Sequence, residues 1–150
     1  MNKPTFDQIN IICGDLRESL TFYRRLGIEI PDARVWYAST GAHHASAFEL
    51  SSDGVVDLDL DSTAFAQRWN IGWKGRTDLR GRIVVGFGLP SHSDVDELFR
   101  KMTDAGHRGL QGPHDAFWDT RYAIIEDPDG VAVGLMSPSS EDKKSLPPGV

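Results

Sequence analysis

Apolar and polar residues alternate along residues 8–13. The apolar positions of one face are Ile9, Ile11 and Cys13. This period of two predicts a strand that packs that face on a helix. From residue 16 onward the apolar positions recur at helical spacing, between Asp15 as the predicted N-cap and Gly27 as the stop. The first predicted elements are therefore a strand and an amphipathic helix.

The same two patterns recur along the chain. Further strands are predicted at residues 28–30, 35–38, 45–50 and 55–60, the last after a turn at residues 51–54. Residues 61–81 show no period and are predicted to be an irregular connector. The second half has a strand at residues 83–89, a helix at 93–105, a loop, and strands at 122–126 and 131–136. The first half is thus predicted to be βαβββ, and the second half repeats its order.

Spacing supports this repeat. The turns at residues 53–54 and 129–130 are 76 positions apart, and the same offset places the strand at Gln8 on the strand at Val84. The two helices match at an offset of 79. We therefore predict two related modules in one chain rather than a chance agreement of apolar periods.

Composition narrows the class of protein. The 150 residues are 39% hydrophobic and 25% charged, as expected for one packed domain. The net charge of -6, with no basic run longer than a pair, argues against nucleic acid as a partner. The single cysteine, Cys13, excludes an internal disulfide and predicts a reducing compartment. There is no signal-like segment and no 18-residue apolar run, so we expect a cytoplasmic protein that contacts no membrane.

Two segments carry a resemblance to a known family. They are Ser19-Leu-Thr-Phe-Tyr-Arg-Arg-Leu-Gly27, after Asp15, and Trp118-Asp-Thr-Arg-Tyr-Ala-Ile-Ile-Glu-Asp-Pro-Asp-Gly130. Over residues 6–137 the chain resembles the vicinal oxygen chelate superfamily, which includes glyoxalase I, extradiol dioxygenases, and bleomycin and fosfomycin resistance proteins. The resemblance implies an α+β fold of two tandem βαβββ modules, whose mixed sheets curl into a cup-shaped pocket that a homodimer commonly completes.

The resemblance also implies a domain organisation. We expect one vicinal-oxygen-chelate-like domain over residues 1–137, followed by a flexible tail. Its parts are module one at about residues 6–61, a connector at 62–81 and module two at 82–137, and the tail is 138–150.

Metal-dependent members of this family take ligands from the first and last strands of each module. The first-strand positions fall on Gln8, an amide that can still be a ligand, and on Val84, which has no lone pair. The last-strand position of module two falls on Gly134, whose side chain is a hydrogen. Because a catalytic site needs about three protein ligands, we expect a metal-free pocket without a cofactor.

The fourth ligand position depends on strand register. If module one copied module two, Asp57 and Asp59 would point into the helix, where unpaired carboxylates are costly. We therefore predict the opposite parity, produced by a one-residue bulge or turn difference. In that register the helix side holds Val56, Leu58 and Leu60, and the cup side or its rim holds Asp57, Asp59 and Asp61.

Alternation also predicts what lines the cup. On the side of module two the lining positions are Val84, Gly86, Gly88, Ala132, Gly134 and Met136. The glycines are predicted to leave room for a ligand, although sheet curvature or dimer packing would also explain them. On the side of module one Gln8, Asn10, Asp57 and Asp59 offer amides and carboxylates to amine or hydroxyl groups.

Aromatic and basic side chains complete the candidate ligand site. Trp73 and Trp118 are predicted to stack on a flat ligand, with core packing or dimer burial as the alternative. Arg121 is a candidate partner for an anionic ligand, and a salt bridge to Asp119 or Glu126 is the competing interpretation.

The histidines give no catalytic pattern. His43 and His44 are predicted to be exposed in a loop, and no histidine has a partner at metal-ligand spacing. We find no Ser-His-Asp ordering and no nucleophile elbow. Cys13 is predicted to face the helix as a small hydrophobic residue.

These observations favour a metal-independent, homodimeric protein that binds a cationic or aromatic small molecule, as the drug-binding branch of the family does. The alternative is a lyase, isomerase or dioxygenase of the same fold, either with misassigned metal ligands or acting without metal through Gln8 and Asp59. The sequence does not name the ligand, because this fold supports many chemistries.

Overall fold

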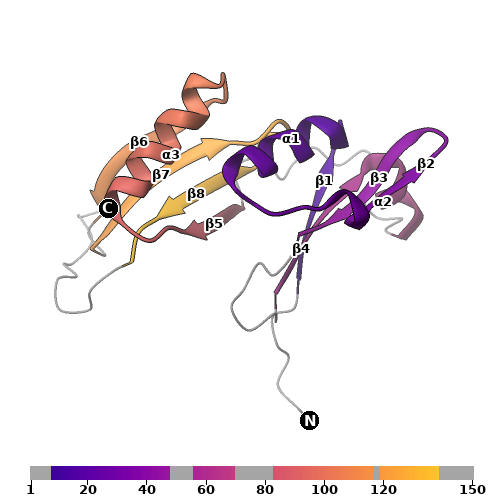
Figure 1. Ribbon diagram of the computed structural model, residues 1–150, viewed down its shortest axis with the longest axis horizontal. Coiled ribbons are helices and arrows are strands. Elements are labelled where there is room, and N and C mark those ends of the chain that lie inside the picture. The colour runs from indigo at the N-terminus through magenta and orange to yellow at the C-terminus, as the bar shows by residue number, and fades with distance from the viewer. Residues whose placement is uncertain (1–7, 48–55, 70–82, 117–118, 139–150) are drawn as a thin grey trace, which may run out of the picture. The chain divides into compact units, whose positions relative to one another are not determined.

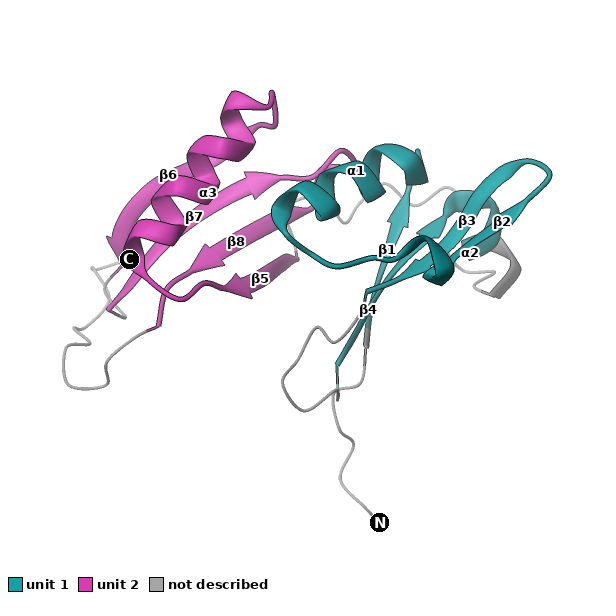
Figure 2. Ribbon diagram, in the orientation of Figure 1, with its two compact units in different colours: residues 1–76 teal, residues 77–150 magenta. Residues whose placement is uncertain are grey.

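The computed structural model describes residues 8–47, 56–69, 83–116 and 119–138. The chain divides into two compact units, Met1–Arg76 and Thr77–Val150, which are coloured separately in Figure 2. Each unit holds one four-stranded mixed sheet with helices, as Figure 1 shows. The predicted α+β fold of two βαβββ modules is confirmed.

The first unit contains seven described elements. In chain order they are β1 (Gln8–Cys13), α1 (Leu16–Leu26), the 3-10 helix η1 (Asp32–Arg34), β2 (Val35–Ala38), β3 (Gly41–Ser46), β4 (Asp57–Ser62) and α2 (Thr63–Trp69). The strand order across the sheet is β1-β4-β3-β2. Only β1 and β4 run parallel, while β3 is antiparallel to both of its neighbours.

Local sequence explains both ends of α1. The carboxylate of Asp15 accepts hydrogen bonds from the backbone N–H groups of Arg17 and Glu18, at 2.9 and 3.4 Å. These bonds satisfy donors that the first helical turn leaves without partners. At the other end Gly27 adopts a φ of +107°, which favours glycine. Both predicted helix ends are confirmed.

One face of the first sheet packs on α1. The buried strand residues on this face are Ile11, Cys13, Ala45, Leu58 and Leu60. They meet the buried apolar side of α1, which includes Leu20 and Tyr23. Because strand side chains alternate, Asn10, Asp59 and the other intervening residues lie on the opposite face of the sheet.

The register confirms the predicted parity of β4. Gln8 pairs with Asp57 in the first unit, and Val84 pairs with Ala132 in the second. Gln8 and Val84 are 76 positions apart, whereas Asp57 and Ala132 are 75 apart. This difference of one residue places Asp59, rather than Leu58, at the position that corresponds to Gly134.

The second unit repeats the topology. Its elements are β5 (Val84–Gly88), α3 (His92–Asp104), β6 (Gly109–Ala116), β7 (Thr120–Glu126) and β8 (Ala132–Met136). The strand order is β5-β8-β7-β6, and β5 and β8 run parallel. The helix α3 packs on the face of the sheet that carries the buried residues Ala123, Ile125, Val133 and Leu135.

Several predicted boundaries are wrong. Residues 28–30 form no strand, and the strand predicted at 45–50 is instead β3, which begins at Gly41. The segment after Asp61 is not wholly irregular, because it contains α2. The loop predicted after Gly106 holds the strand β6. The strands β3 and β6 contain glycine, proline or polar residues, so their pairing is determined by neighbouring strands rather than by apolar alternation.

Candidate functional site

Five polar side chains meet on the face of the first sheet that lies opposite α1. We call this group the polar cluster, and it consists of Asn10, His44, Ser46, Asp59 and Asp61. Three strands contribute to it. The register brings them together, because His44 is directly opposite Asp61, Ser46 is opposite Asp59, and Asn10 is opposite Asp59.

Asp61 is the buried centre of the polar cluster, with only 1% of its surface exposed. Its Oδ1 lies 2.6 Å from Nδ1 of His44, and its Oδ2 accepts a hydrogen bond of 3.0 Å from Nδ2 of Asn10. A buried carboxylate requires such partners. Because an ionised carboxylate only accepts hydrogen bonds, Nδ1 of His44 carries the hydrogen in this contact.

Ser46 connects this buried pair to the second carboxylate. Its Oγ lies 3.2 Å from Nε2 of His44 and donates a hydrogen bond of 2.6 Å to Oδ1 of Asp59. Asp59 and Ser46 are half-buried, and 30% of the His44 side chain is exposed. The polar cluster therefore reaches solvent at His44, Ser46 and Asp59.

Aromatic rings border the polar cluster. The ring of Phe65, from α2, lies 5.7 Å from the ring of His44 and 5.5 Å from that of Trp36, measured between centroids. Trp36 is opposite His44 in the register, and half of its surface is exposed. The combination of carboxylates with exposed aromatic surface suits a cation or a flat ring.

A second His–Ser pair lies in the same two strands. Nδ1 of His43 is 2.8 Å from Oγ of Ser62, and its Nε2 is 2.6 Å from Oγ1 of Thr40. The side chain of His43 is thus hydrogen-bonded to two hydroxyl groups. Its electrostatic environment therefore differs from that of His44, whose Nδ1 faces a buried carboxylate.

The structure brings two predicted ligand residues, Asn10 and Asp59, into this cluster. Asp57 lies on the same face but is exposed, and the backbone of Gln8 pairs with it. Trp73 and Trp118 lie outside the described residues. The structure adds His44, Ser46 and Asp61 to the site, and of these only Asp61 was expected on this face.

The prediction for the histidines is wrong for His43 and His44. Both belong to the strand β3 rather than to a loop, and His44 joins a Ser–His–Asp line of hydrogen bonds. Alternation along residues 42–46 would have placed His44 and Ser46 on one face. We did not predict a strand at His44, because this residue and Ser46 are polar and the segment begins with a glycine.

Neighbouring side chains take up part of the room predicted above the glycines, whereas nothing lies within 4 Å of the place for a Cβ at Gly88. The hydroxyl oxygen of Tyr122 lies 2.8 Å from the place that a Cβ at Gly134 would occupy, and Cε of Met136 lies 2.9 Å from that place at Gly86. Side chains of neighbouring strands therefore fill the space beside Gly134 and Gly86 but not beside Gly88. Burial raises the pKa of the Tyr122 phenol.

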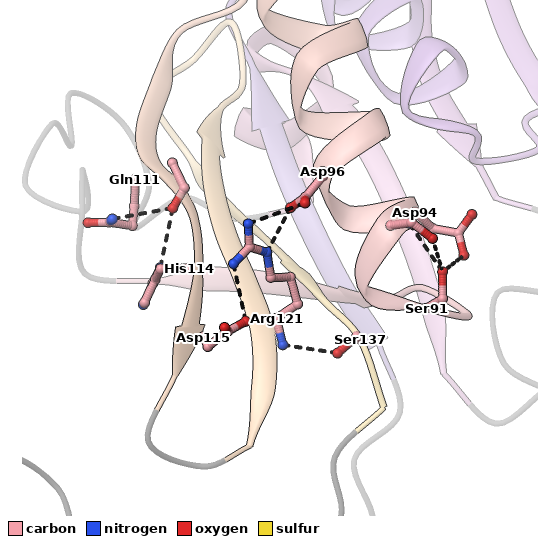
Figure 3. A network of polar contacts seen from close by, with 10 residues as sticks. Ser91, Asp94, Asp96, Gln111, His114, Asp115, Arg121 and Ser137 are labelled. Carbon is pink, nitrogen blue, oxygen red and sulfur yellow. Dashed lines mark hydrogen bonds and ion pairs between the residues drawn. The ribbon is translucent and has the colours of Figure 1, made fainter.

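Arg121 is paired within the second unit, as Figure 3 shows. Its Nε lies 2.8 Å from a carboxylate oxygen of Asp96, on α3, and its Nη1 lies 3.1 Å from one of Asp115, on β6. The hydrogen bond with Asp96 raises the pKa of Arg121. The salt-bridge interpretation is therefore confirmed, although the partners are Asp96 and Asp115 in place of the predicted Asp119 or Glu126.

The residues at the family's ligand positions do not fit a bound metal. Val84 and Gly134 occupy two of these positions and offer no ligand atom. Among the residues that the structure describes, no group of three or more His, Cys, Asp or Glu side chains is arranged to hold a metal ion. Within the same residues, no helix is long and apolar enough to cross a membrane.

Comparison with known proteins defines the class. Residues 5–135 match the Glyoxalase/Bleomycin resistance protein/Dioxygenase superfamily, and the chain belongs to this family. No curated protein matches the sequence closely enough to extend this assignment.

Solved structures agree on the fold. A glyoxalase/bleomycin resistance protein/dioxygenase family enzyme from Burkholderia phytofirmans PsJN has a TM-score of 0.71 at 14% identity, over 87% of this chain and 96% of that chain. A glyoxalase/bleomycin resistance protein/dioxygenase from Nocardioides has a TM-score of 0.69 at 17% identity, over 97% and 91%. A glyoxalase-related enzyme from Fulvimarina pelagi has a TM-score of 0.69 at 16% identity, over 96% and 99%. At these identities the likeness concerns the fold alone.

Proposed function

We propose that this chain is a metal-independent protein that binds and sequesters a cationic, aromatic small molecule at the polar cluster. One observation carries the proposal. The carboxylates of Asp59 and Asp61 lie on the same sheet face as Trp36. The ring of Phe65, from α2, lies against the rings of Trp36 and His44. A carboxylate beside an aromatic surface stabilises a positive charge, and the flat rings favour an aromatic substituent.

Charge supports the same class of ligand. The chain has a net charge of -6, so its field attracts cations over anions. Arg121 is already paired with two carboxylates. An anionic ligand at the polar cluster would meet Asp59 at close range, which is unfavourable.

A thermal-shift screen on the metal-free protein tests the proposal. Benzylammonium and naphthylmethylammonium are the cationic probes, and benzyl alcohol and naphthylmethanol are their uncharged counterparts. At one hundred times its dissociation constant a ligand adds about 2.7 kcal/mol of apparent stability. A larger shift with the ammonium compound of each pair supports the proposal, and equal or absent shifts contradict it.

Metal independence has its own test. Val84 and Gly134 remove two ligand positions, so we expect the purified protein to retain less than about one-tenth of an equivalent of Zn, Ni, Mn or Fe after dialysis. Elemental analysis by mass spectrometry measures this content. Stoichiometric metal would instead favour the lyase, isomerase or dioxygenase alternative.

We further propose that the protein is a homodimer. Trp36 and Tyr37 are 50% and 57% exposed on β2, which is an edge strand of the first sheet. An edge strand with exposed aromatic side chains favours pairing with another chain. Sedimentation velocity at tens of micromolar tests this, and a single monomeric species would contradict it.

A further inference from the structure

We propose that Ser46, His44 and Asp61 form a nucleophilic site for acyl transfer from uncharged aromatic esters. Oγ of Ser46 lies 3.2 Å from Nε2 of His44, and Nδ1 of His44 lies 2.6 Å from Oδ1 of Asp61. A serine, a histidine base and a carboxylate that orients the base are the parts of an activated hydroxyl nucleophile. This proposal rests on the geometry of the polar cluster and not on the ligand proposed above.

Asp61 is suited to the positioning role. It is 1% exposed, and Asn10 holds its second oxygen at 3.0 Å. The carboxylate accepts the Nδ1 hydrogen of His44, so the other ring nitrogen, Nε2, faces Ser46. With both oxygens engaged, Asp61 fixes the tautomer and the orientation of the ring.

A count of hydrogens defines the reactive form. Three contacts join Asp59, Ser46, His44 and Asp61 in a line, and each contact needs one hydrogen. Ser46 supplies one hydrogen. In this arrangement that hydrogen is donated to Oδ1 of Asp59. The reactive form is the one in which the hydroxyl of Ser46 instead donates to Nε2 of His44, which lies 3.2 Å away.

The proposed reaction needs no reactant other than the ester and water. Oγ of Ser46 attacks the ester carbon while its proton passes to Nε2 of His44. The bond from that carbon to the leaving oxygen then breaks, and the leaving oxygen takes the proton from His44. Water repeats these steps on the acylated serine and releases the acid.

The surroundings indicate the substrate class. Phe65 and Trp36 offer ring surfaces beside His44, so they favour an ester with an aromatic group. The carboxylate of Asp59 lies 2.6 Å from Oγ of Ser46 and disfavours an anionic ester. Within the described residues, the hydrogen-bonded chain from Asp59 to Asp61 contains three titratable groups, His44, Asp59 and Asp61. The neighbouring rings of Phe65 and Trp36 are not titratable.

Labelling of the intact protein by an uncharged alkyl fluorophosphonate tests the proposal. Oγ of Ser46 forms a bond to phosphorus as fluoride leaves. Intact mass and peptide mapping should find one adduct, on Ser46, and Ser46→Ala should abolish it. His44→Ala and Asp61→Asn should slow labelling by roughly a hundredfold, the scale of general-base catalysis.

The pair His43 and Ser62 supplies the matched control. Oγ of Ser62 also lies close to a histidine, at 2.8 Å from Nδ1 of His43, but the other ring nitrogen of His43 is bonded to the hydroxyl of Thr40 rather than to a carboxylate. Ser62→Ala should therefore leave labelling of Ser46 unchanged within about twofold. Circular dichroism checks that each variant is folded.

The pH profile separates a positioning role for Asp61 from a purely structural one. In the wild type the labelling rate should rise with pH to a plateau, as expected of general-base catalysis. In folded Asp61→Asn the plateau should be lost, and the rate should rise with hydroxide concentration. Absence of an adduct on Ser46 in the wild type, or equal rates in His44→Ala, would overturn the proposal. Hydrolysis of p-nitrophenyl acetate should follow the same order of variants.

Discussion

The hydroxyl oxygen of Tyr122 lies 2.8 Å from the place where a Cβ at Gly134 would be, and two atoms of its ring lie within 3.3 Å of that place. The two residues are on neighbouring strands, β7 and β8, and face the same side of the second sheet. Gly134 is itself buried. Glycine at this position therefore serves the packing of Tyr122.

We expect Gly134→Ala to lower the free energy of unfolding by about 1–3 kcal/mol, because a new methyl group would displace an aromatic ring from a packed position. Urea unfolding measures the change. The matched control is Gly86→Ala, where the atom displaced is the flexible methyl end of Met136. That variant should lose less than about 1 kcal/mol, and an equal loss in both would contradict the interpretation.

Asp61→Ala should lower the free energy of unfolding by about 2 kcal/mol, since it removes the buried acceptor of the hydrogen bonds from His44 and Asn10. The control is Asp57→Ala, on the same strand and face but exposed, which should change stability by less than about 0.5 kcal/mol. Urea unfolding at neutral pH measures both. Similar small effects would show that the Asp61 network adds nothing to stability.

Tyr122 should make stability depend on alkaline pH. Burial raises its pKa above the ordinary value of 10.0, so the folded state holds the phenolic proton at pH values where the unfolded chain has released it. The stabilising effect is complete below pH 10 and is lost as pH rises through the pKa of the folded state. In Tyr122→Phe this loss, measured by urea unfolding at pH values rising above 10, should be smaller. Tyr37→Phe, at an exposed position, should behave like the wild type.

Asp59→Asn should weaken binding of the best cationic aromatic probe by about 1–3 kcal/mol, the scale of a charge-assisted hydrogen bond. Affinity in the wild type should fall with added salt, and binding should quench tryptophan fluorescence, because Trp36 borders the polar cluster. Asp104→Asn makes the same charge change at an exposed position on α3 and should bind normally. If both variants bind alike, Asp59 has no role in recognition.

The sequence alone determined α1, α3, most strands and the sides of β1 and β4 that face α1. Alternation of Leu58 and Leu60 with aspartates was sufficient to predict the parity of β4, because burying unpaired carboxylates against α1 would be costly. The ends of α1 at Asp15 and Gly27 followed from local hydrogen bonding and backbone conformation. These features depend on neighbouring residues, so a single sequence reveals them.

Only the tertiary structure decided which polar residues meet. His44 and Asp61 are 17 positions apart, and Asn10 and Asp61 are 51 apart. Their hydrogen bonds depend on the pairing of β3 and β1 with β4. A shift of one residue in either pairing would send these side chains to different faces. The same holds for the contact between Tyr122 and Gly134. The side chain of Tyr122, on β7, occupies the space beside Gly134, on β8, and no local sequence pattern indicates this contact.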